Sequence, residues 1–325
     1  MLALSKHLYI VDDLKWSFMD AILNNRIKES IFWITEYYES GYKKETWQLL
    51  YVVFSCFYFK NYSYYLNKLD KKYKIWSKDN NFEHVLNITY RFSKMNKKDF
   101  NFFKIFWHGL KCKFCNEKGG LLNILLKILD NKKYRNVWFF INYNFEKTLK
   151  IVSKFYNTNF VFKNTDINDK KVQLFMFIYL LNNGKTKSKP NIKITKELKN
   201  FYESIIKDEN KTYEILKYKR LYGIPKEIGC FNLERFNYKH KNIVNNYFNN
   251  WEFMANKSEI WKGRIEECFG KVDMNKINFP NSELEEKFYD KYNLEPDEQN
   301  LETHNKSICE IEKYNLTEWI KSFKN

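Results

Sequence analysis

Hydrophobic residues recur at helical spacing over most of this chain. The clearest run advances in steps of four, three and four residues, the period of one buried helix face; it consists of Ile27, Ile31, Ile34 and Tyr38. Similar runs precede and follow it within residues 12–62, formed by Leu14, Phe18, Met19 and Ile22 on one side and by Trp47, Leu50, Tyr51, Phe54 and Tyr58 on the other. The pattern predicts three successive helices that share one aromatic-rich core.

Polar residues and one glycine mark where these helices begin and end. We expect Asp12 and Asp13 to cap the first helix, because an Asp side chain accepts a hydrogen bond from a free backbone N–H and suits the positive helix end. We expect Gly41 to end the second helix, because glycine adopts the left-handed conformation at little cost. The third helix is expected to begin at Glu45.

Further helices are predicted along the rest of the chain, and extended pieces are few. The run from Lys68 to Lys78 is so rich in charge that we interpret it as a connector. The segments 160–162 and 272–279 are the candidates for extended structure. Helices are expected at about 82–92, 100–106, 121–129, 137–156, 170–181, 196–206, 243–254, 260–269, 284–292 and 308–323.

The distribution of proline supports the helical prediction. The first of only 4 prolines is Pro190, and a proline inside a helix costs about 3 kcal/mol. The predicted fold is all-α, built of stacked antiparallel helical hairpins with minor extended pieces. We expect an aromatic-rich helical domain (1–183), a basic linker (184–195), a second helical region (196–280) and an acidic helical C-terminal segment (281–325).

Charge is unevenly distributed along the chain. The net charge is +17, of which residues 281–325 contribute −5 and residues 1–280 contribute +22. A body this basic attracts polyanions and releases counterions when it meets nucleic acid. However, 50 of the 56 basic residues are lysine, which AT-rich codons favour, whereas arginine is the better bidentate ligand for phosphate. Two interpretations stay open, a nucleic-acid or acidic-protein partner and a merely solvated lysine surface.

Nucleic-acid contacts are expected in two basic stretches. The candidate residues are Lys185, Lys187 and Lys189 in the linker and Lys217, Lys219 and Arg220 beyond it. Aromatic side chains between lysines could also stack on single-stranded bases, but aromatics at helical spacing more often belong to a core. The tryptophans to which this choice applies include Trp33, Trp47, Trp107, Trp138, Trp251 and Trp261.

His108, Cys112 and Cys115 are weak candidate metal ligands. Together they offer three possible zinc ligands, including a Cys-x-x-Cys pair. Structural zinc needs four ligands, and no second close pair completes the set, so Cys230 or His84 would have to fold back. We therefore interpret these cysteines as ordinary, partly buried residues and expect no metal and no cofactor.

Other catalytic motifs are incomplete. The triplet 184–186, Gly-Lys-Thr, resembles the end of a phosphate-binding loop, but Tyr179 stands five residues before Gly184 where the loop needs a glycine. Adjacent carboxylates do not share a helix face, and this excludes Asp12–Asp13, Glu285–Glu286 and Asp297–Glu298 as acid–base pairs. No catalytic residue is predicted.

Neither a signal peptide nor a membrane-spanning run is evident. The longest largely apolar run, 49–59, is far shorter than the roughly 20 residues that cross a bilayer. The 6 cysteines form no dense framework. We therefore expect a protein that is not secreted, that stays in a reducing compartment and that does not insert into membranes.

Distinctive phrases are spread over most of the chain. They are Ile31-Phe32-Trp33-x-x-Glu36-x-Tyr38-x-Ser40-Gly41 with Trp47-x-Leu49-Leu50, then Arg220-Leu221-Tyr222-x-Ile224-Pro225, Trp251-Glu252, Ile260-Trp261-x-x-Arg264-Ile265 and Glu285-x-x-Phe288-Tyr289-x-x-Tyr292-Asn293-x-Glu295-Pro296-Asp297-Glu298-Gln299. In these phrases the chain resembles helical proteins encoded by giant (nucleocytoplasmic large) DNA viruses, a family without an established biochemical activity. The resemblance implies a location in the host cytoplasm (the viral factory) or the virion.

The first helical hairpin is also similar to the C-terminal helical region of clamp-loader-like AAA+ ATPases, which helps to build an oligomeric collar. This resemblance covers the first hairpin alone, and the ATPase half is missing. The leading hypothesis is a non-enzymatic giant-virus structural or interaction protein whose basic body contacts nucleic acid in the virion or the genome-processing machinery. The alternatives are a homo-oligomeric scaffold that uses the first hairpin and a metal-dependent enzyme.

Overall fold

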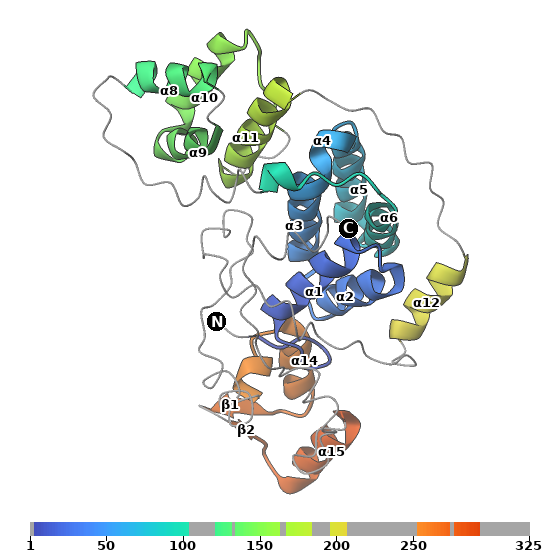
Figure 1. Cartoon of the computed structure of the whole chain (residues 1–325). Coiled ribbons are helices and arrows are strands. Elements are labelled where there is room, and N and C mark those ends of the chain that lie inside the picture. The colour runs from blue at the N-terminus through green and yellow to red at the C-terminus, as the bar shows by residue number, and fades with distance from the viewer. Residues whose placement is uncertain are drawn as a thin grey trace.

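The computed structural model describes residues 3–103, 121–131, 134–162, 167–183, 196–206, 252–273 and 276–292. Most of these residues are helical, and the two short strands among them pair into one small hairpin (Figure 1). The all-α fold predicted from the hydrophobic pattern is therefore confirmed.

Helices joined by short turns fill the first third of the chain. They are α1 (Val11–Leu23), α2 (Ile27–Glu39), α3 (Lys43–Val53), α4 (Phe59–Tyr62), α5 (Tyr65–Asp79) and α6 (Glu83–Ser93). A π-helical turn, η1 (Phe54–Tyr58), joins α3 to α4, and all five of its residues are buried. The three helices expected within residues 12–62 are thus present, the third widened by this π turn.

The later helices are α8 (Leu121–Asp130), α9 (Tyr134–Tyr143), α10 (Phe145–Phe155), α11 (Ile167–Asn183), α12 (Lys196–Ile206), α14 (Glu259–Glu267) and α15 (Ser282–Tyr292). Strands β1 (Lys271–Asp273) and β2 (Lys276–Asn278) are antiparallel, with Val272 opposite Ile277. In Figure 1 helices α8–α11 lie together at the upper left, and the hairpin lies below with α14 and α15.

Helix α2 is the centre of the main hydrophobic core. Its residues from Ser30 to Tyr38 are all buried, and α1, α3, α6 and α12 contact it. Aromatic rings fill much of the space, for example Trp33, whose ring centroid lies 5.1 Å from that of Tyr9. The same core continues into α8–α11, where the Trp138 ring meets the Phe175 ring edge to face. One continuous core therefore includes α1–α6, α8–α11 and α12.

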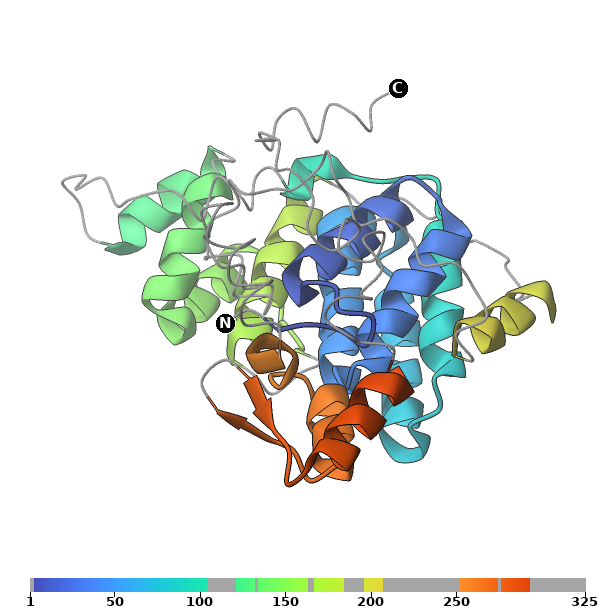
Figure 2. The same cartoon turned by 90° about the horizontal axis from the view of Figure 1, so that it is seen from below.

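A second, smaller core forms where the N-terminal segment meets the C-terminal elements. Leu4, Leu8 and Ile10 are buried in it, whereas Tyr9 and Val11, next in sequence, are buried in the main core. The C-terminal elements contribute Met254, Ala255, Trp261, Ile265, Cys268, Ile277 and Phe288. Figure 2 shows α14, α15 and the hairpin, in orange, on one side of the first helices. The N-terminal segment 3–10 thus contributes side chains to both cores.

Several boundaries follow the sequence prediction. Helix α2 ends at Glu39, and Gly41 has a φ of +99°, so glycine ends this helix in the left-handed region as expected. Of the segment 272–279, residues 272–273 belong to β1 and residues 276–278 to β2, and α6, α8 and α12 occupy their predicted segments. By contrast, the segment 160–162 forms no strand.

The expected Asp cap of α1 is wrong. Helix α1 begins at Val11, its N-cap is Ile10, and no side chain caps it. Asp12 lies inside the first turn and pairs with Lys15, the carboxylate oxygen and the ammonium nitrogen being 3.2 Å apart. The N-terminal segment folds back so that the Val11 N–H donates to the Ala3 carbonyl, and this turn of the backbone fixes the helix start.

Two other predicted elements need correction. Residues 68–78 form most of helix α5 rather than a connector, because Leu66, Leu69 and Trp76 supply it with a buried face. The single helix expected at 137–156 is two helices, α9 and α10. Asn144 separates them, since its side-chain oxygen caps α10 by accepting a hydrogen bond from the Lys147 N–H at 3.0 Å.

The predicted domain boundary at 184–195 lies outside the described residues and stays a prediction. Beyond it, α12 lies against α2, and Ile205 belongs to the main core. The predicted helix at 308–323 also lies outside the described part. Within the ranges that the structure describes, no helix combines the length and apolar character needed to cross a bilayer.

Candidate functional site

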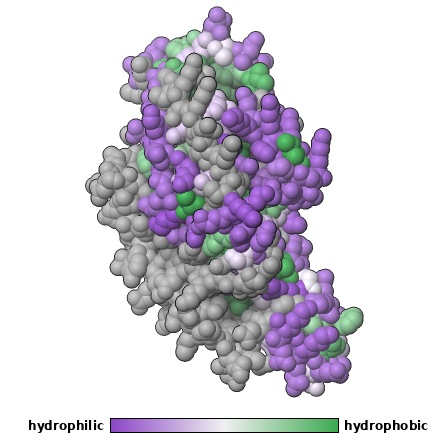
Figure 3. Space-filling model, turned by 90° about the vertical axis from the view of Figure 1, so that its right-hand side faces the viewer, coloured by the Kyte–Doolittle hydropathy of each residue, from purple (hydrophilic) through white to green (hydrophobic). Residues whose placement is uncertain are grey.

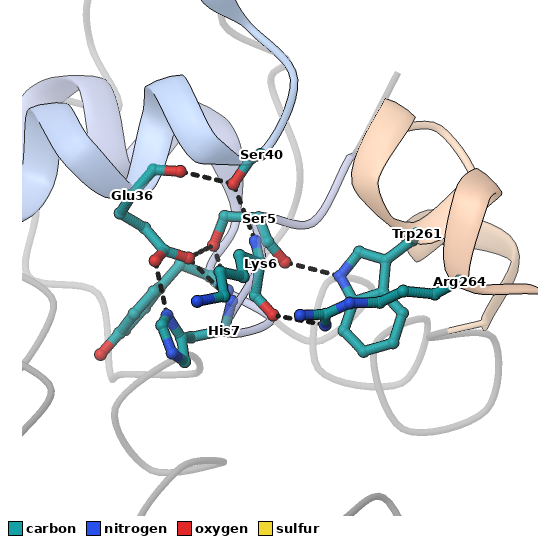
Figure 4. Close-up of polar contacts among 8 residues, drawn as sticks. Ser5, Lys6, His7, Glu36, Ser40, Trp261 and Arg264 are labelled. Carbon is teal, nitrogen blue, oxygen red and sulfur yellow. Dashed lines mark hydrogen bonds and ion pairs between the residues drawn. The ribbon is translucent and has the colours of Figure 1, made fainter. Parts of the chain in front are cut away.

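The most elaborate polar cluster of the described residues lies where the N-terminal segment meets the C-terminal end of α2. Its centre is Glu36, whose side chain is only 1% exposed. One carboxylate oxygen accepts hydrogen bonds from the Ser5 hydroxyl at 2.5 Å and from the His7 backbone N–H at 2.7 Å. The other lies 2.5 Å from His7 Nδ1 (Figure 4). Segment 3–10 is thus fixed to α2 through a buried charge.

These partners determine the ionisation of Glu36. Burial alone raises the pKa of a carboxyl, because it removes water from the charged form. At Glu36 the positive charge of His7 and the hydrogen bonds from His7 and Ser5 outweigh burial, and the pKa lies below its ordinary value. These contacts favour the carboxylate form of Glu36, which accepts from both Ser5 and the His7 backbone.

Ser40 connects the same segment to the end of α2. Its hydroxyl donates to the Glu36 backbone carbonyl at 2.5 Å and accepts from the Lys6 backbone N–H at 2.8 Å. A helix end leaves carbonyl groups without intrahelical partners. Ser40 donates to one of them, the Glu36 carbonyl, and at the same time binds the N-terminal segment through the Lys6 N–H.

Helix α14 binds the other side of this segment. Trp261 Nε1 donates to the Ser5 carbonyl at 2.7 Å, and an Arg264 guanidinium nitrogen lies 3.3 Å from the Lys6 carbonyl (Figure 4). The start of α14 also approaches Gly41, where a Cβ atom would come within 2.6 Å of Glu259 Cβ. We call the set Ser5, Lys6, His7, Glu36, Ser40, Trp261 and Arg264 the polar junction.

The polar junction is organised for cohesion rather than for acid–base chemistry. Ser5 is fully buried, and its hydroxyl both donates to Glu36 and accepts from the Tyr9 N–H at 3.1 Å. A nucleophile must reach its substrate and give its proton to a base, whereas the buried Ser5 hydroxyl donates to a carboxylate that also accepts from the His7 backbone and contacts the His7 ring. The geometry joins α2, the N-terminal segment and α14 into one body.

A surface of a different kind runs along helix α5. Lys68, Lys71, Lys74 and Lys78 follow one another at steps of three, three and four residues, so they share one face of the helix. All four side chains are exposed. In the described part of the chain no carboxylate lies within ion-pair distance of any of them. We call these four residues the lysine face.

The acidic residues of α5 are engaged elsewhere. Asp70 accepts a hydrogen bond from the Tyr51 hydroxyl at 2.6 Å, and Asp79 lies 2.8 Å from His84 Nε2 and accepts from the Asn81 N–H. These contacts, together with the His84 charge, lower the pKa of Asp79. One lysine has a partner of its own, since Lys68 Nζ lies 5.6 Å from the centre of the Tyr64 ring. The lysine face therefore keeps most of its charge available to solvent.

Hydrophilic residues predominate over the described surface on the side that Figure 3 shows, and hydrophobic residues are visible there only in small, separate areas. The described part of this side therefore presents no large apolar patch of the kind that marks a hydrophobic interface. The basic character inferred from composition has its counterpart in the exposed lysines of α5.

The structure bears on the predicted site residues unevenly. The candidate metal ligands His108, Cys112 and Cys115 lie outside the described residues, as do the nucleic-acid candidates Lys185, Lys187, Lys189, Lys217, Lys219 and Arg220. Within the described ranges, no group of three or more His, Cys, Asp and Glu side chains is placed to hold a metal ion.

The tryptophan candidates for base stacking divide in the same way. Trp33, Trp47, Trp138 and Trp261 are at most 2% exposed, so they belong to the cores, as the helical spacing favours. Trp107 and Trp251 are outside the described residues.

Sequence reasoning missed both sites that the structure presents. For the lysine face a signal exists, because Leu66, Leu69 and Trp76 recur at helical spacing between the lysines. For the polar junction the only signal is Glu36 itself, the single carboxylate within the buried stretch 30–38 of α2. No pattern links it to His7, which lies 29 residues earlier.

Comparison with known proteins gives no relative for this chain: no family model, no curated protein and no solved structure matches it.

Proposed function

We propose that this protein is a non-enzymatic interaction protein that binds nucleic acid, and that the lysine face of α5 is its contact surface. The observation that carries the proposal is the arrangement of Lys68, Lys71, Lys74 and Lys78 along one exposed helix face, while Asp70 and Asp79 are engaged with other groups.

The dimensions of this face suit a phosphate backbone. From Lys68 to Lys78 the helix rises about 15 Å at 1.5 Å per residue, a length that covers several phosphates of one strand. Each phosphate that a lysine neutralises releases a counterion. The plot of the logarithm of the binding constant against the logarithm of the salt concentration then becomes steeper by about 0.7 for a single strand and about 0.9 for a duplex. We call the slope of this plot the salt slope. Lysine contributes charge without the bidentate geometry of arginine, so the expected binding is independent of sequence.

The resemblance to giant-virus proteins supplies a context for the proposal. A basic helical protein of such a virus would accompany the genome in the virion, in the viral factory or in the genome-processing machinery. The strong excess of positive charge in residues 1–280 supports a polyanionic partner. A scaffold that oligomerises through the first hairpin is less favoured, because the residues 30–38 of α2 are all buried within their own chain.

The test is a salt titration with two charge-matched variants. One replaces Lys68, Lys71, Lys74 and Lys78 with alanine. The control removes four exposed lysines from the C-terminal elements, namely Lys262, Lys271, Lys276 and Lys287. Binding to a 30-nucleotide single strand and to a 30-base-pair duplex is measured between about 50 and 200 mM salt, a range over which phosphate contacts dominate affinity.

We expect the salt slope, that is, the slope of log K against log salt concentration, to be shallower by about 2 to 4 in the first variant and by less than about 1 in the control. Equal decreases of the slope in both variants would mean that binding depends on the net charge of the protein and not on the lysine face. Absence of binding by the unmodified protein at 50 mM salt would reject the nucleic-acid partner and leave an acidic protein as the remaining candidate.

A further inference from the structure

We infer that helix α10 provides a second phosphate-binding surface, so that one chain joins two segments of nucleic acid. The surface consists of Lys147, Lys150 and Lys154, which we call the α10 lysine row. The inference rests on the proposed function, because the lysine face of α5 holds the first segment. It adds a second site and a bridging activity to that function.

Helices α5 and α10 present lysines at the same spacing. The α10 lysine row advances in steps of three and four residues, and so do Lys71, Lys74 and Lys78 on α5. At 3.6 residues per turn, three residues with this spacing lie within about 60° of the helix circumference, so they share one face. Each set extends over about 10 Å of helix, at 1.5 Å per residue.

The α10 lysine row lies opposite the buried side of its helix. The buried residues of α10 are Phe145, Thr148 and Val152, and each stands two residues before a lysine of the row. Two residues correspond to about 200° around a helix, so the lysines point away from the packed side. The Thr148 hydroxyl donates to the Phe140 carbonyl of α9 at 2.8 Å and fixes this orientation. All three lysines of the row are exposed.

The charges of the row are not neutralised by carboxylates in the described part of the chain. Lysines on other helices have acidic partners, for example Lys199 with Glu83 and Lys291 with Glu267. None of the ion pairs among the described residues includes a lysine of the α10 row. Glu146 lies in the first turn of α10, where the helix dipole favours a negative charge. With three lysines and this one glutamate, α10 has a net charge of +2.

The two basic surfaces belong to different groups of helices. Helix α5 lies among α1–α6, and α10 lies among α8–α11. In both Figure 1 and Figure 2 the blue first helices and the green later helices occupy different sides of the molecule. The main core continues from one group into the other, so one folded body carries both surfaces. Two separate cationic surfaces on one body allow two segments to be held at once.

Charge complementarity identifies the partner of the α10 lysine row as a second phosphate backbone. Duplex DNA carries one negative charge per about 1.7 Å of its axis, so a row about 10 Å long meets several phosphates. Lysine supplies charge without the bidentate geometry of arginine, and the second site is therefore expected to bind without regard to sequence. With three lysines against four, it should bind more weakly than the lysine face and fill after it.

The experiment counts the duplexes that one chain binds and asks whether the chain holds two of them together. The protein is mixed with a 12-base-pair duplex in about 50 mM ammonium acetate, a salt concentration that preserves phosphate contacts. Native mass spectrometry gives the number of duplexes per protein and shows whether the protein is monomeric. Bridging is measured as the amount of a fluorescent duplex that the protein retains on beads carrying a biotinylated duplex.

Three variants are compared with the unmodified protein. One replaces the α10 lysine row with alanine, and a second replaces the lysine face with alanine. The control replaces three exposed lysines of the C-terminal elements, namely Lys271, Lys276 and Lys287. Circular dichroism should show the same helical content in all of them, because exposed charges contribute little to folding.

We expect the unmodified monomer and the control to bind two duplexes, and each of the other two variants to bind one. Bridging should fall at least about tenfold in both of these variants, since one surface cannot hold two molecules, and should change less than about twofold in the control.

Two duplexes bound to the α10 variant would overturn the inference, as would a single duplex bound to the unmodified monomer. Bridging that occurs only with a dimeric protein would overturn it too, because the two segments would then lie on two chains. If the α5 variant loses binding and the α10 variant does not, the proposed function stands and the inference is rejected. Absence of any bound duplex on the unmodified protein would reject the proposed function itself.

Discussion

At the polar junction one carboxylate, Glu36, lies almost fully buried among a hydroxyl, an imidazole and a backbone N–H. On the lysine face four ammonium groups project from α5 into solvent, with no carboxylate of the described residues at ion-pair distance. Removal from water makes the first charge expensive unless every partner is in place. The four exposed lysines contribute little to the free energy of folding, and their charges are available to ligands.

The comparison shows that charge has separate roles in different parts of this fold. Loss of a partner at the polar junction leaves a buried group unsatisfied and should weaken the whole body, because the junction joins α2, the N-terminal segment and α14. Loss of a lysine on α5 removes little packing and should act on binding alone. Stability measurements and binding measurements on matched variants can therefore test the division.

The largest effect is expected from Glu36→Ala. This change removes the acceptor of three hydrogen bonds and leaves His7 and Ser5 without their partner in a buried site. Breaking a buried ion pair costs about 3 to 5 kcal/mol, which urea denaturation would measure as a lower free energy of unfolding. Glu45→Ala serves as the control, because Glu45 is exposed and should change stability by no more than about 0.5 kcal/mol.

Similar stabilities for the two glutamate variants would contradict the view of Glu36 as a structural anchor. Far-UV circular dichroism of Glu36→Ala should still show a helical protein, since the main core extends well beyond the junction.

The next effect concerns a pair of glycines. Gly41→Ala puts a Cβ atom at a φ of +99° and within 2.6 Å of Glu259 Cβ, and strain of this type costs of order 1 to 3 kcal/mol. Gly263 lies inside α14 with no atom within 4 Å of an added Cβ, so Gly263→Ala should stabilise by about 0.5 to 1 kcal/mol. Opposite shifts in the melting temperature of the two variants are the expected result. Equal shifts would contradict both the positive φ of Gly41 and its close approach to Glu259 of α14.

A smaller effect should appear with pH. The pKa of Glu36 is below its ordinary value in the folded state, so the unfolded chain binds this proton more readily than the folded one. The stabilisation from the carboxylate is therefore complete above the ordinary pKa of glutamate and declines as the pH falls through the lower, folded-state value. The difference in unfolding free energy between the unmodified protein and Glu36→Gln should shrink from pH 6 to pH 3. A constant difference over this range would contradict the carboxylate assignment.

Much of the fold follows from local sequence. Ile31 and Ile34 recur at helical spacing, and Gly41 ends α2 in the conformation that only glycine adopts freely. Helix α5 could have been predicted from Leu66, Leu69 and Trp76, but five lysines within eleven residues obscure that face and favour the connector interpretation. The start of α1 was not predictable from Asp12, because it depends on a backbone turn that the N-terminal segment makes with the core.

The two sites differ in the same respect. The lysine face lies on one helix. Once that helix is recognised, the spacing of its lysines in the sequence is enough to predict that they share a face. The polar junction combines His7, Glu36 and Trp261, residues that are distant along the chain. Which distant polar groups meet is decided by tertiary packing, and a single sequence carries no periodic signal for it. A carboxylate on the buried stretch of a helix, such as Glu36 within residues 30–38, indicates only that some partner must exist.

The smallest expected change in stability gives the sharpest test of the comparison. Lys71→Ala removes one ammonium from the middle of the lysine face, where the side chain is exposed, and should alter the free energy of unfolding by no more than about 0.5 kcal/mol. The same variant should lower the logarithmic salt slope for single-strand binding by about 0.7, the value for one phosphate contact. Lys287→Ala on α15, also exposed, should leave both quantities unchanged. If Lys71→Ala instead lowers stability by more than about 1 kcal/mol while the salt slope stays constant, the lysines of α5 act in folding, and the distinction between a buried anchor and an exposed binding face no longer holds.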